Sequence, residues 1–461
     1  MTTFIRNNIK SSLVLASIAM GLGACSNDDI NSVNVPEDKY EISSIPVAYT
    51  VNNHNKADNF SVEFRENYEI ELHVNLTKPT DQLTNAEFYF NPQVLAKYNE
   101  LKGTKFLEYP ADLIEFDNDG KVEIITGQTK STAAALKVKA GDKNEPSITY
   151  VIPVSVKSDS KGIKVGKNAD YLIFIKDLTT LPDAAKASGI KIISCMEVND
   201  TNPLNNLNFT LKGSGKPLVD ILILFSGNIN YNAETGKVFN HNNPNVQHIL
   251  DNRVKYLKPL QDRGIKVVLG ILGNHDVAGV NNLAPETAKE FAKELKAVCD
   301  AYNLDGIFWD DEYSNSPDGT PGFQSGGASR LIYEVKQAMP DKLNCAYAYG
   351  STGYLSNIDG VQPGDYIDWA IDDYGGYASG SYPGIKNSQW SVASQEFNRG
   401  YWAADSRLQQ LRNEGYGGHM IFAMDPFRTN VSRQISAMES IAGILFDDEL
   451  VVDENYYSKD W

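Results

Sequence analysis

Cysteine and histidine are scarce in this sequence, whose 461 residues include only four cysteines and six histidines. Three of the cysteines, Cys195, Cys299 and Cys345, lie in apolar stretches, without a CxxC motif, an HxxxH motif or a cysteine–histidine spacing. Their odd number argues against a complete disulfide framework, so we interpret them as core thiols. With no paired ligands in the sequence, we expect neither a metal site nor a cofactor.

Nucleotide-binding turns are also missing, because neither GxGxxG nor GxxxxGK[ST] occurs in the sequence. Positive charge is in deficit, with 42 Lys and Arg against 59 Asp and Glu and a formal net charge of −17. Such a chain has no broad basic surface to neutralise phosphates, which argues against nucleic acid or an anionic membrane surface as the main partner. A neutral substrate fits this balance.

Long hydrophobic runs are absent as well. The apolar stretch SSLVLASIAMGLGA follows Arg6 and Lys10; it is too short to span a bilayer but suits the core of a signal peptide. It ends in Leu-Gly-Ala-Cys, which resembles the lipobox of bacterial lipoproteins and implies a signal peptide over 1–24 and a lipid on Cys25. Ordinary signal cleavage beside an incidental cysteine is the alternative.

The following residues, SNDD, resemble the acidic tag of surface-exposed lipoproteins in Gram-negative gut anaerobes. The resemblance implies an outer-membrane lipoprotein on the cell surface, which touches the membrane only through its lipid anchor. Residues 25–45 are polar and predict a tether. From 46 to 168, short runs such as FSVEFRENYEIELHVNLT alternate apolar and polar residues between turns, which predicts a small antiparallel β-sandwich acting as a spacer or adhesion module.

The pattern changes over 185–461, where near-continuous apolar strands alternate with helical segments such as APETAKEFAKELKAVCDAYN. Strands buried on both faces and separated by helices indicate an α/β fold with a parallel sheet. Eight candidate strands predict a (β/α)8 TIM barrel, with a doubly wound open sheet as the alternative. The candidates are GIKIISCMEV, LVDILILFSG, GIKVVLGILG, LDGIFWDDE, KLNCAYAYG, YIDWAIDDYG, QWSVAS and GGHMIFAMD.

The fourth candidate strand carries carboxylates at both ends, in LDGIFWDDEYSN over 304–315. Because side chains alternate along a strand, Asp310 and Glu312 share a face, at the end where barrel enzymes place catalytic groups. Two such close carboxylates interact, so one should hold a proton near neutral pH. We expect Asp305 and Asp311 to be solvated instead, and Trp309 to pack outward against helices.

This stretch is similar to the DGxDxDxE signature of family 18 glycoside hydrolases, especially the endo-β-N-acetylglucosaminidases of the endoglycosidase H and F type. Further stretches over about 185–450, including ILFSGNINYN, VVLGILGNHDVAG and EGYGGHMIFAMD, resemble successive strands of that barrel in order. One position departs from the signature, because Phe308 replaces its first central Asp. That replacement should leave Asp310 less coupled from below.

The resemblance implies substrate-assisted retaining catalysis, in which the acetamido oxygen of the sugar attacks its own anomeric carbon. It implies that Glu312 donates the proton to the leaving group and that Asp310 orients the acetamido N–H. It also implies that Tyr374, in WAIDDYGGY, hydrogen-bonds the acetamido oxygen. As substrate contacts we predict Asn274 and His275.

Asp372, beside Asp373, is a further predicted contact that could equally be solvated. Trp369, Tyr377 and Trp390 are candidates for stacking on sugars or for packing. The reaction implied is cleavage of the GlcNAc-β1,4-GlcNAc bond in the core of N-linked glycans, leaving one GlcNAc on the protein. A chitinase of the same family and a non-catalytic glycan-binding surface lipoprotein are the alternatives.

Overall fold

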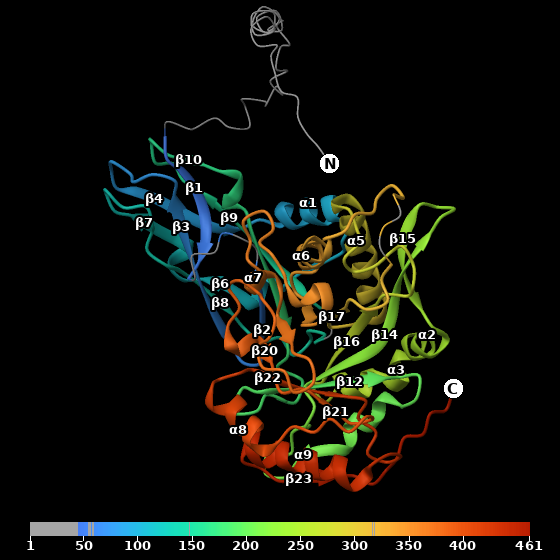
Figure 1. Ribbon diagram of the computed structural model, residues 1–461. Helices are drawn as coiled ribbons and strands as arrows, with labels where there is room; N and C mark the ends of the chain where they lie inside the picture. Colours follow the sequence, from blue (N-terminus) through green and yellow to red (C-terminus); the bar gives the residue numbers. More distant parts are fainter. Residues whose placement is uncertain (1–44, 54–56, 58–59, 147, 316, 318) are drawn as a thin grey trace, which may run out of the picture.

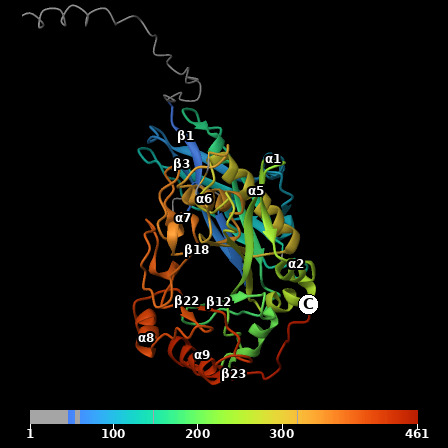
Figure 2. The same cartoon turned by 45° about the vertical axis from the view of Figure 1, so that its right-hand side comes forward.

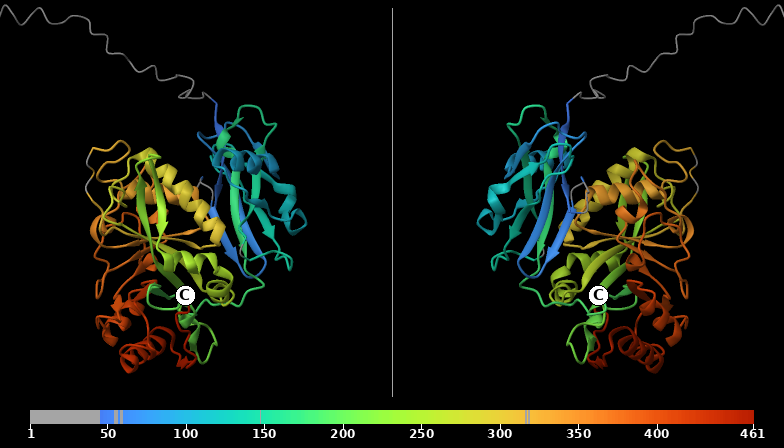
Figure 3. Two further views of the ribbon diagram at one scale, coloured as in Figure 1. Left: turned by 90° about the vertical axis from the view of Figure 1, so that its right-hand side faces the viewer. Right: turned by 90° about the vertical axis from the view of Figure 1, so that its left-hand side faces the viewer.

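The computed structural model describes residues 45–461 apart from 54–56, 58–59, 147, 316 and 318. A β-sandwich at the N-terminal side is joined to a parallel barrel (Figure 1). Figure 3 shows the two as neighbouring bodies, with the sandwich strands along one flank of the barrel. The predicted signal peptide, Cys25 and nearly all of the predicted tether lie outside the described residues.

The sandwich consists of two sheets whose strands alternate between buried and exposed residues, as in β3. The first sheet has the order β10 (Lys164–Val165), β1 (Val47–Asn52), β3 (Tyr68–Leu76), β8 (Ala134–Val138), β6 (Ile114–Phe116). The second has the order β2 (Phe60–Phe64), β11 (Tyr171–Asp177), β9 (Tyr150–Lys157), β4 (Thr84–Phe90), β7 (Lys121–Ile124), with β5 (Leu107–Glu108) beside β9. Pairing is antiparallel except for β1–β10, β2–β11 and β5–β9, which are parallel.

Strand β11 lies beyond residue 168, where the alternating pattern ends. All seven of its residues are buried, because the sandwich core covers one face and helix α1 (Pro92–Lys102) covers the other. Leu172 and Phe174 pack against Leu95 of that helix. A strand buried on both faces has no polar side to alternate with, so it reads as a continuous apolar run.

The barrel confirms the predicted TIM fold, since eight parallel strands close on themselves where β12 pairs with β22. Helix α5 (Pro285–Tyr302) shows why a helix can cover this sheet, because its apolar residues Ala288, Phe291, Ala292 and Leu295 recur three and four apart and form one buried face. In order the strands are β12 (Lys191–Glu197), β14 (Ile221–Asn232), β16 (Lys266–Leu272), β17 (Gly306–Asp310), β18 (Leu343–Tyr347), β19 (Trp369–Ile371), β20 (Trp390–Ser391) and β22 (Gly418–Phe422).

The helices are distributed unevenly around this barrel. They are α2 (Pro244–Asp251), α3 (Arg253–Tyr256), α4 (Lys258–Gln261), α5 (Pro285–Tyr302), α6 (Ala328–Ala338), α7 (Pro363–Tyr366), α8 (Asp405–Asn413) and α9 (Val431–Phe446). No α-helix follows β12 or β19 within the fully described stretches 198–220 and 372–389, so the regular alternation of strand and helix is broken twice. Two short strands extend the barrel sheet, β15 (Lys237–Asn242) beside β14 and β21 (Gln395–Glu396) beside β22.

The C-terminal tail covers the side of the barrel where the first helix is missing. Strand β23 (Leu450–Val452) pairs with β13 (Phe209–Leu211), and the amides of Asn202, Asn205 and Asn208 donate to backbone carbonyls of the tail. The indole of Trp461 stacks on the ring of His248 at 5.6 Å. Figures 1 and 2 both place β23 with α8 and α9 at the end of the molecule remote from β1 and β3.

The sandwich packs against the N-terminal ends of barrel strands through two ion pairs, of which the first is largely buried and the second about one-third exposed. Lys176 of β11 bonds Asp305 at 3.1 Å, and Lys266 at the start of β16 bonds Glu63 of β2 at 2.6 Å. The expectation that Asp305 is solvated was therefore wrong. A charge removed from water needs a partner, and the other domain supplies it.

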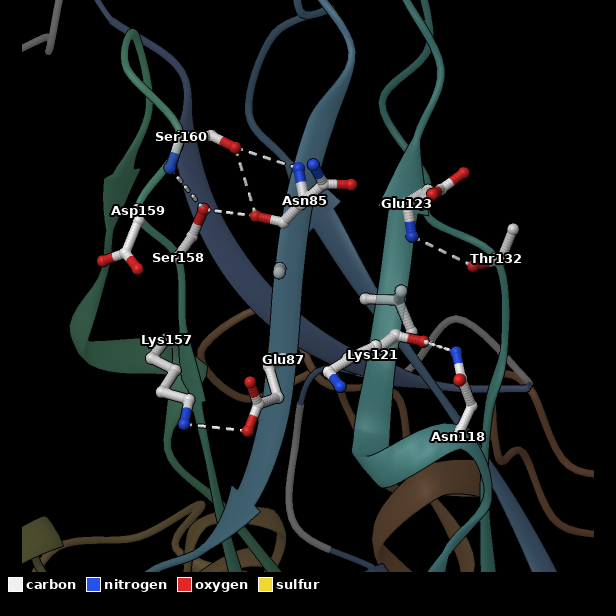
Figure 4. Close-up of a pocket in the computed structure, with 12 residues that line it drawn as sticks. Asn85, Glu87, Asn118, Lys121, Glu123, Thr132, Lys157, Ser158, Asp159 and Ser160 are labelled. Atoms are coloured by element: carbon white, nitrogen blue, oxygen red, sulfur yellow. Dashed lines mark hydrogen bonds and ion pairs between the residues drawn. The ribbon is translucent and has the colours of Figure 1, made fainter.

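A hollow of about 680 Å³ lies on the outer face of β4, β7 and β9 (Figure 4). Lys157 pairs with Glu87 across it at 2.8 Å, and Ser160 donates to the carbonyl of Asn85. This face is a solvated sheet surface. Across the described residues, no helix is long and apolar enough to cross a membrane, and no group of acidic, histidine or cysteine side chains is arranged to hold a metal.

Candidate active site

The site is built on β17, whose side chains alternate as the sequence predicts. Phe308 points into the barrel among Cys195, Val268 and Cys345. Trp309 points outward into the core under the helices, as predicted, and its indole N–H donates to Asn344 at 2.7 Å. The next inward residue is therefore Asp310, at the carboxyl end of the strand. All three central cysteines are free and buried, as predicted.

A cleft of about 790 Å³ opens at this carboxyl end of the barrel. The three predicted catalytic residues, Asp310, Glu312 and Tyr374, all line it, although they come from two different strands. The other lining residues are Cys195, Glu197, Phe225, Leu272, Phe308, Asp311, Tyr313, Tyr347, Tyr349, Asp373, Arg399, Met420 and Phe422. Apolar rings thus form the floor and carboxylates form the walls.

Asp310 is the most buried of these carboxylates. Its side chain is 6% exposed, and its Oδ1 atom is shielded from solvent with no hydrogen-bond partner in the described part of the chain. Burial, followed by the charges of Glu312, Asp311 and Asp373, raises its pKa to about 8. Asp310 therefore holds a proton at neutral pH, while one of its oxygens remains available to a ligand.

Glu312 follows the end of β17 and is only partly buried. The next residue, Tyr313, adopts a left-handed backbone with φ of 58°, and its carbonyl accepts from the His275 amide at 2.7 Å. A Cβ on Gly273 would overlap the carbonyl oxygen of Glu312, so only glycine allows the two loops to approach this closely. The charge of Glu312 raises the pKa of Tyr313, so this phenol stays protonated beside it.

Tyr374 lies just after β19 and is separated from β17 by strand β18. Its ring stacks on Tyr401 at 5.7 Å and contacts Phe422. Burial is the main cause of its raised pKa, so the hydroxyl remains a proton donor at any physiological pH. Sequence reasoning missed its neighbour Tyr347, although a tyrosine at the carboxyl end of a barrel strand is itself a signal.

None of the predicted substrate contacts, Asn274, His275 and Asp372, lines the cleft. Asn274 and His275 are exposed on the adjoining loop; the amide of Asn274 donates to Asn230, and the His275 ring lies 5.1 Å from Tyr313. Asp372 is 0% exposed and accepts from the Ser379 backbone amide at 3.0 Å, so it supports a turn and is not free to contact a sugar.

The other aromatic candidates pack as well. Trp390 is buried against Tyr382 at 5.1 Å, and Tyr377 lies 5.0 Å from Tyr416. Trp369 lies at the opposite end of the barrel, near Lys266. None of the three lines the cleft.

Comparison with known proteins agrees with this fold. Endo-beta-N-acetylglucosaminidase F1 of Elizabethkingia meningoseptica is 56% identical over 282 residues, which cover 59% of this chain and 83% of that protein. An endo-beta-N-acetylglucosaminidase of Flavobacterium sp. (strain SK1022) is 34% identical over 258 residues, covering 55% and 81%. A family model described as an N-terminal domain matches residues 38–163.

Among solved structures, Bacteroides thetaiotaomicron EndoBT-3987 with a Man5GlcNAc product superposes with a TM-score of 0.79 at 36% identity. The match covers 89% of this chain and 97% of that one, so it includes both the sandwich and the barrel. The same enzyme in complex with a Man9GlcNAc2Asn substrate gives a TM-score of 0.73 at 33% identity, with the same coverage. With its barrel, its paired carboxylates and these relatives, the chain belongs to the endo-β-N-acetylglucosaminidase family.

Proposed function

We propose that this protein hydrolyses the GlcNAc-β1,4-GlcNAc bond in the core of N-linked glycans and leaves one GlcNAc on the protein. The observation that carries the proposal is the convergence of Asp310, Glu312 and Tyr374 on one cleft. The two EndoBT-3987 complexes add support, because that enzyme is bound to Man9GlcNAc2Asn as substrate and to Man5GlcNAc as product. A mannose-bearing N-glycan is accordingly the substrate class we assign.

The reaction begins with one proton shared by Asp310 and Glu312, since two close carboxylates do not both ionise readily. When the 2-acetamido group enters, its N–H needs an acceptor, and the unpartnered Asp310 oxygen is the group placed to accept it. Acting as an anion, Asp310 then leaves the proton to Glu312. Glu312 becomes the general acid that protonates the leaving O4.

The acetamido oxygen attacks the anomeric carbon as the bond to O4 breaks, which yields an oxazolinium at the end of the released glycan and, as leaving group, the GlcNAc that stays on the protein. Tyr374 donates its hydroxyl hydrogen to the acetamido oxygen and holds it in line for attack. Glu312, now ionised, removes a proton from water, and the water opens the oxazolinium with overall retention. Asp310 stabilises the cationic ring throughout.

The test is incubation of protein lacking residues 1–25 with a panel of N-glycoproteins, followed by mass spectrometry of both products. We expect released glycans that end in one GlcNAc and asparagines that retain one GlcNAc. Glycans released with both core residues would refute the bond assignment. Soluble chitin oligomers as the only products would make the protein a chitinase, and binding without turnover would make it a glycan-binding protein.

We further propose that the protein is an outer-membrane lipoprotein, anchored through Cys25 and exposed at the cell surface. The support is the lipobox-like sequence before Cys25 and the acidic residues after it. An N-terminus that carries several acyl chains holds a protein at a membrane far more firmly than a single chain does. Cys25→Ser should move the protein from the membrane fraction to the soluble fraction; a variant that stays membrane-bound would show that the lipobox interpretation is wrong.

A further inference from the structure

Two residues of the cleft wall, Asp373 and Tyr347, form a unit that the proposed reaction does not yet use. The Tyr347 hydroxyl, at the end of β18, donates to Asp373 Oδ1 at 2.5 Å. The same oxygen accepts from the backbone amide of Tyr374 at 2.7 Å. One carboxylate oxygen therefore joins the ends of two neighbouring strands.

These bonds fix the backbone that carries Tyr374. Strand β19 ends at Ile371, so Tyr374 is outside the main run of the barrel sheet and needs other restraints. Its backbone forms a bridge with Ser394 on one side, and the Asp373 carboxylate holds its amide on the other. The position of its hydroxyl thus depends on Asp373, and the position of Asp373 depends on Tyr347.

The carboxylate of Asp373 also lines the same cleft as Asp310, and its charge acts on that carboxyl group. The groups around Asp310 are Glu312 and Asp311 on its own segment, Cys195 and Glu197 from β12, Tyr347 from β18, Asp373 and Tyr374 after β19, Tyr313, and Arg399 from the loop after β21. Arg399 is the only cation among the cleft-lining residues that the structure describes. Asp373 is thus one of three carboxylates whose charges act on Asp310. Glu312 and Asp311 belong to the same segment as Asp310, whereas Asp373 follows β19 and is held in place by Tyr347.

Tyr347 reinforces this arrangement from below. Its ring lies 6.3 Å from that of Phe308, directly under Asp310 on β17, and it stacks on Tyr349 at 5.8 Å. Burial and the Asp373 carboxylate raise the pKa of Tyr347, so the phenol remains a donor to that carboxylate.

Building on the proposed function, we propose that Asp373, clamped by Tyr347, is a positioning residue of the hydrolysis. It holds Tyr374 in place by its backbone amide and keeps a fixed negative charge opposite Asp310. Tyr347 is a positioning residue at one step further removed, since it acts through Asp373. One carboxylate produces both effects, but mutations can separate them. Asp373→Asn removes the charge, whereas Tyr347→Phe keeps the charge and removes only the hydrogen bond that clamps it.

The test compares Asp373→Asn, Tyr347→Phe and the control Tyr377→Phe, whose hydroxyl is buried without a partner in the described chain and lies outside the cleft. Each purified variant is measured for kcat and KM between pH 5 and 9 and for thermal unfolding. Asp373→Asn should lower kcat about 10²-fold, the scale of a small misplacement of a reacting group. The basic limb of its profile of kcat against pH should move to lower pH, because without this like charge Asp310 releases its proton at a lower pH.

Tyr347→Phe keeps the charge and loses only the clamp, so kcat should fall about tenfold while the basic limb stays in place. Tyr377→Phe should match wild type in both. An Asp373→Asn variant with wild-type kcat and pH profile would overturn the proposal, as would losses in kcat that match the fraction unfolded. All comparisons are made on whichever glycan the wild type cleaves, so a wrong bond assignment would show in the wild type alone.

Discussion

Two aspartates on the same strand, Asp305 just before β17 and Asp310 at its end, have opposite ionisation behaviour. Asp310 is buried and the Asp305 side chain is only 13% exposed, yet the Lys176 charge helps to hold the pKa of Asp305 near 2, whereas the pKa of Asp310 is raised to about 8. Burial alone would raise both values. The difference lies in the neighbours, which are lysines at one end of the strand and further carboxylates at the other.

The comparison extends to the two ends of the barrel. At the N-terminal end the sandwich supplies Lys176 and Glu63, which pair with Asp305 and Lys266 of the barrel. At the carboxyl end, five acidic residues of the cleft face Arg399 as their one cation among the described lining residues. Paired charges hold the domains together at one end, and unpaired ones are available for proton transfer at the other.

The largest effect should come from the unpaired end. Glu312→Gln removes the proton donor, and general acid catalysis typically contributes about 10²–10⁴-fold, so kcat/KM on a glycoprotein should fall by that amount. An aryl glycoside of GlcNAc with a good leaving group needs little protonation, so Glu312→Gln should recover much of its cleavage step. Asp310→Asn should recover little there, because oxazolinium formation is itself impaired.

A preformed glycan oxazoline sharpens the contrast, since it bypasses the step that Asp310 assists. Asp310→Asn should therefore still process it. If Asp310→Asn cleaves the natural substrate like wild type, or if the two variants respond alike to both probes, the roles assigned to these residues are wrong.

The next largest effect should appear at the paired end, in stability rather than in catalysis. Lys176→Met leaves Asp305 buried without its closest cation, and loss of one partner of a buried pair typically costs about 3–5 kcal/mol. Chemical unfolding should report this loss, while kcat per folded molecule stays near wild type. The double variant Lys176→Met, Asp305→Asn should regain part of the stability; if it does not, the pair is not what holds the interface.

A pH-dependent effect on stability should come from Asp310→Asn. Between about pH 4 and 8 the folded wild type binds more protons at this position than the unfolded chain, so its stability falls as the pH rises through that window. Asparagine removes the penalty, and Tm should exceed that of wild type by several degrees at pH 8 and by little at pH 4. Asp305 acts oppositely, because its contribution is lost as the pH falls from about 4 toward 2.

The smallest effect should come from the hollow on the sandwich. Glu87→Gln breaks the ion pair with Lys157. This pair lies at the surface, so water screens the attraction between its two charges. We expect Tm within about 1 °C of wild type. A larger shift, or a loss of glycan release, would mean that this face does more than interact with solvent.

Much of the barrel could be predicted from sequence because buried parallel strands are such distinct apolar runs. Seven of the eight candidate segments contain a whole barrel strand, and the eighth, LVDILILFSG, covers the first part of β14, which continues to Asn232. The helix missing after β12 could not be foreseen, since its replacement depends on contacts between Asn205 and Tyr457, which are 252 residues apart. The same limit applies to the partner of Asp305, which lies 129 residues away on another domain.

The site shows where strand periodicity stops being a guide. Within β17 the alternation correctly separates Phe308 from Trp309 and brings Asp310 into the cleft. After β19 the alternation still holds for Ile371, Asp372 and Asp373, but it fails at Tyr374, which lines the cleft beside Asp373. Beyond a strand's last hydrogen bond, side-chain direction is set by turns whose geometry a single sequence does not specify.

The C-terminal tail occupies the place where no α-helix follows β12 in the described residues, and this has a consequence for folding during synthesis. The loop after β12 leaves the ribosome early, but its partners include β23, Tyr457 and Ser458, at the far end of the chain. Closure of β12 on β22 waits for late residues too. Contacts this distant in sequence form slowly, so the nascent barrel remains open along one seam until β22 and β23 have been made. During that interval the exposed seam is the part of the chain most in need of a chaperone.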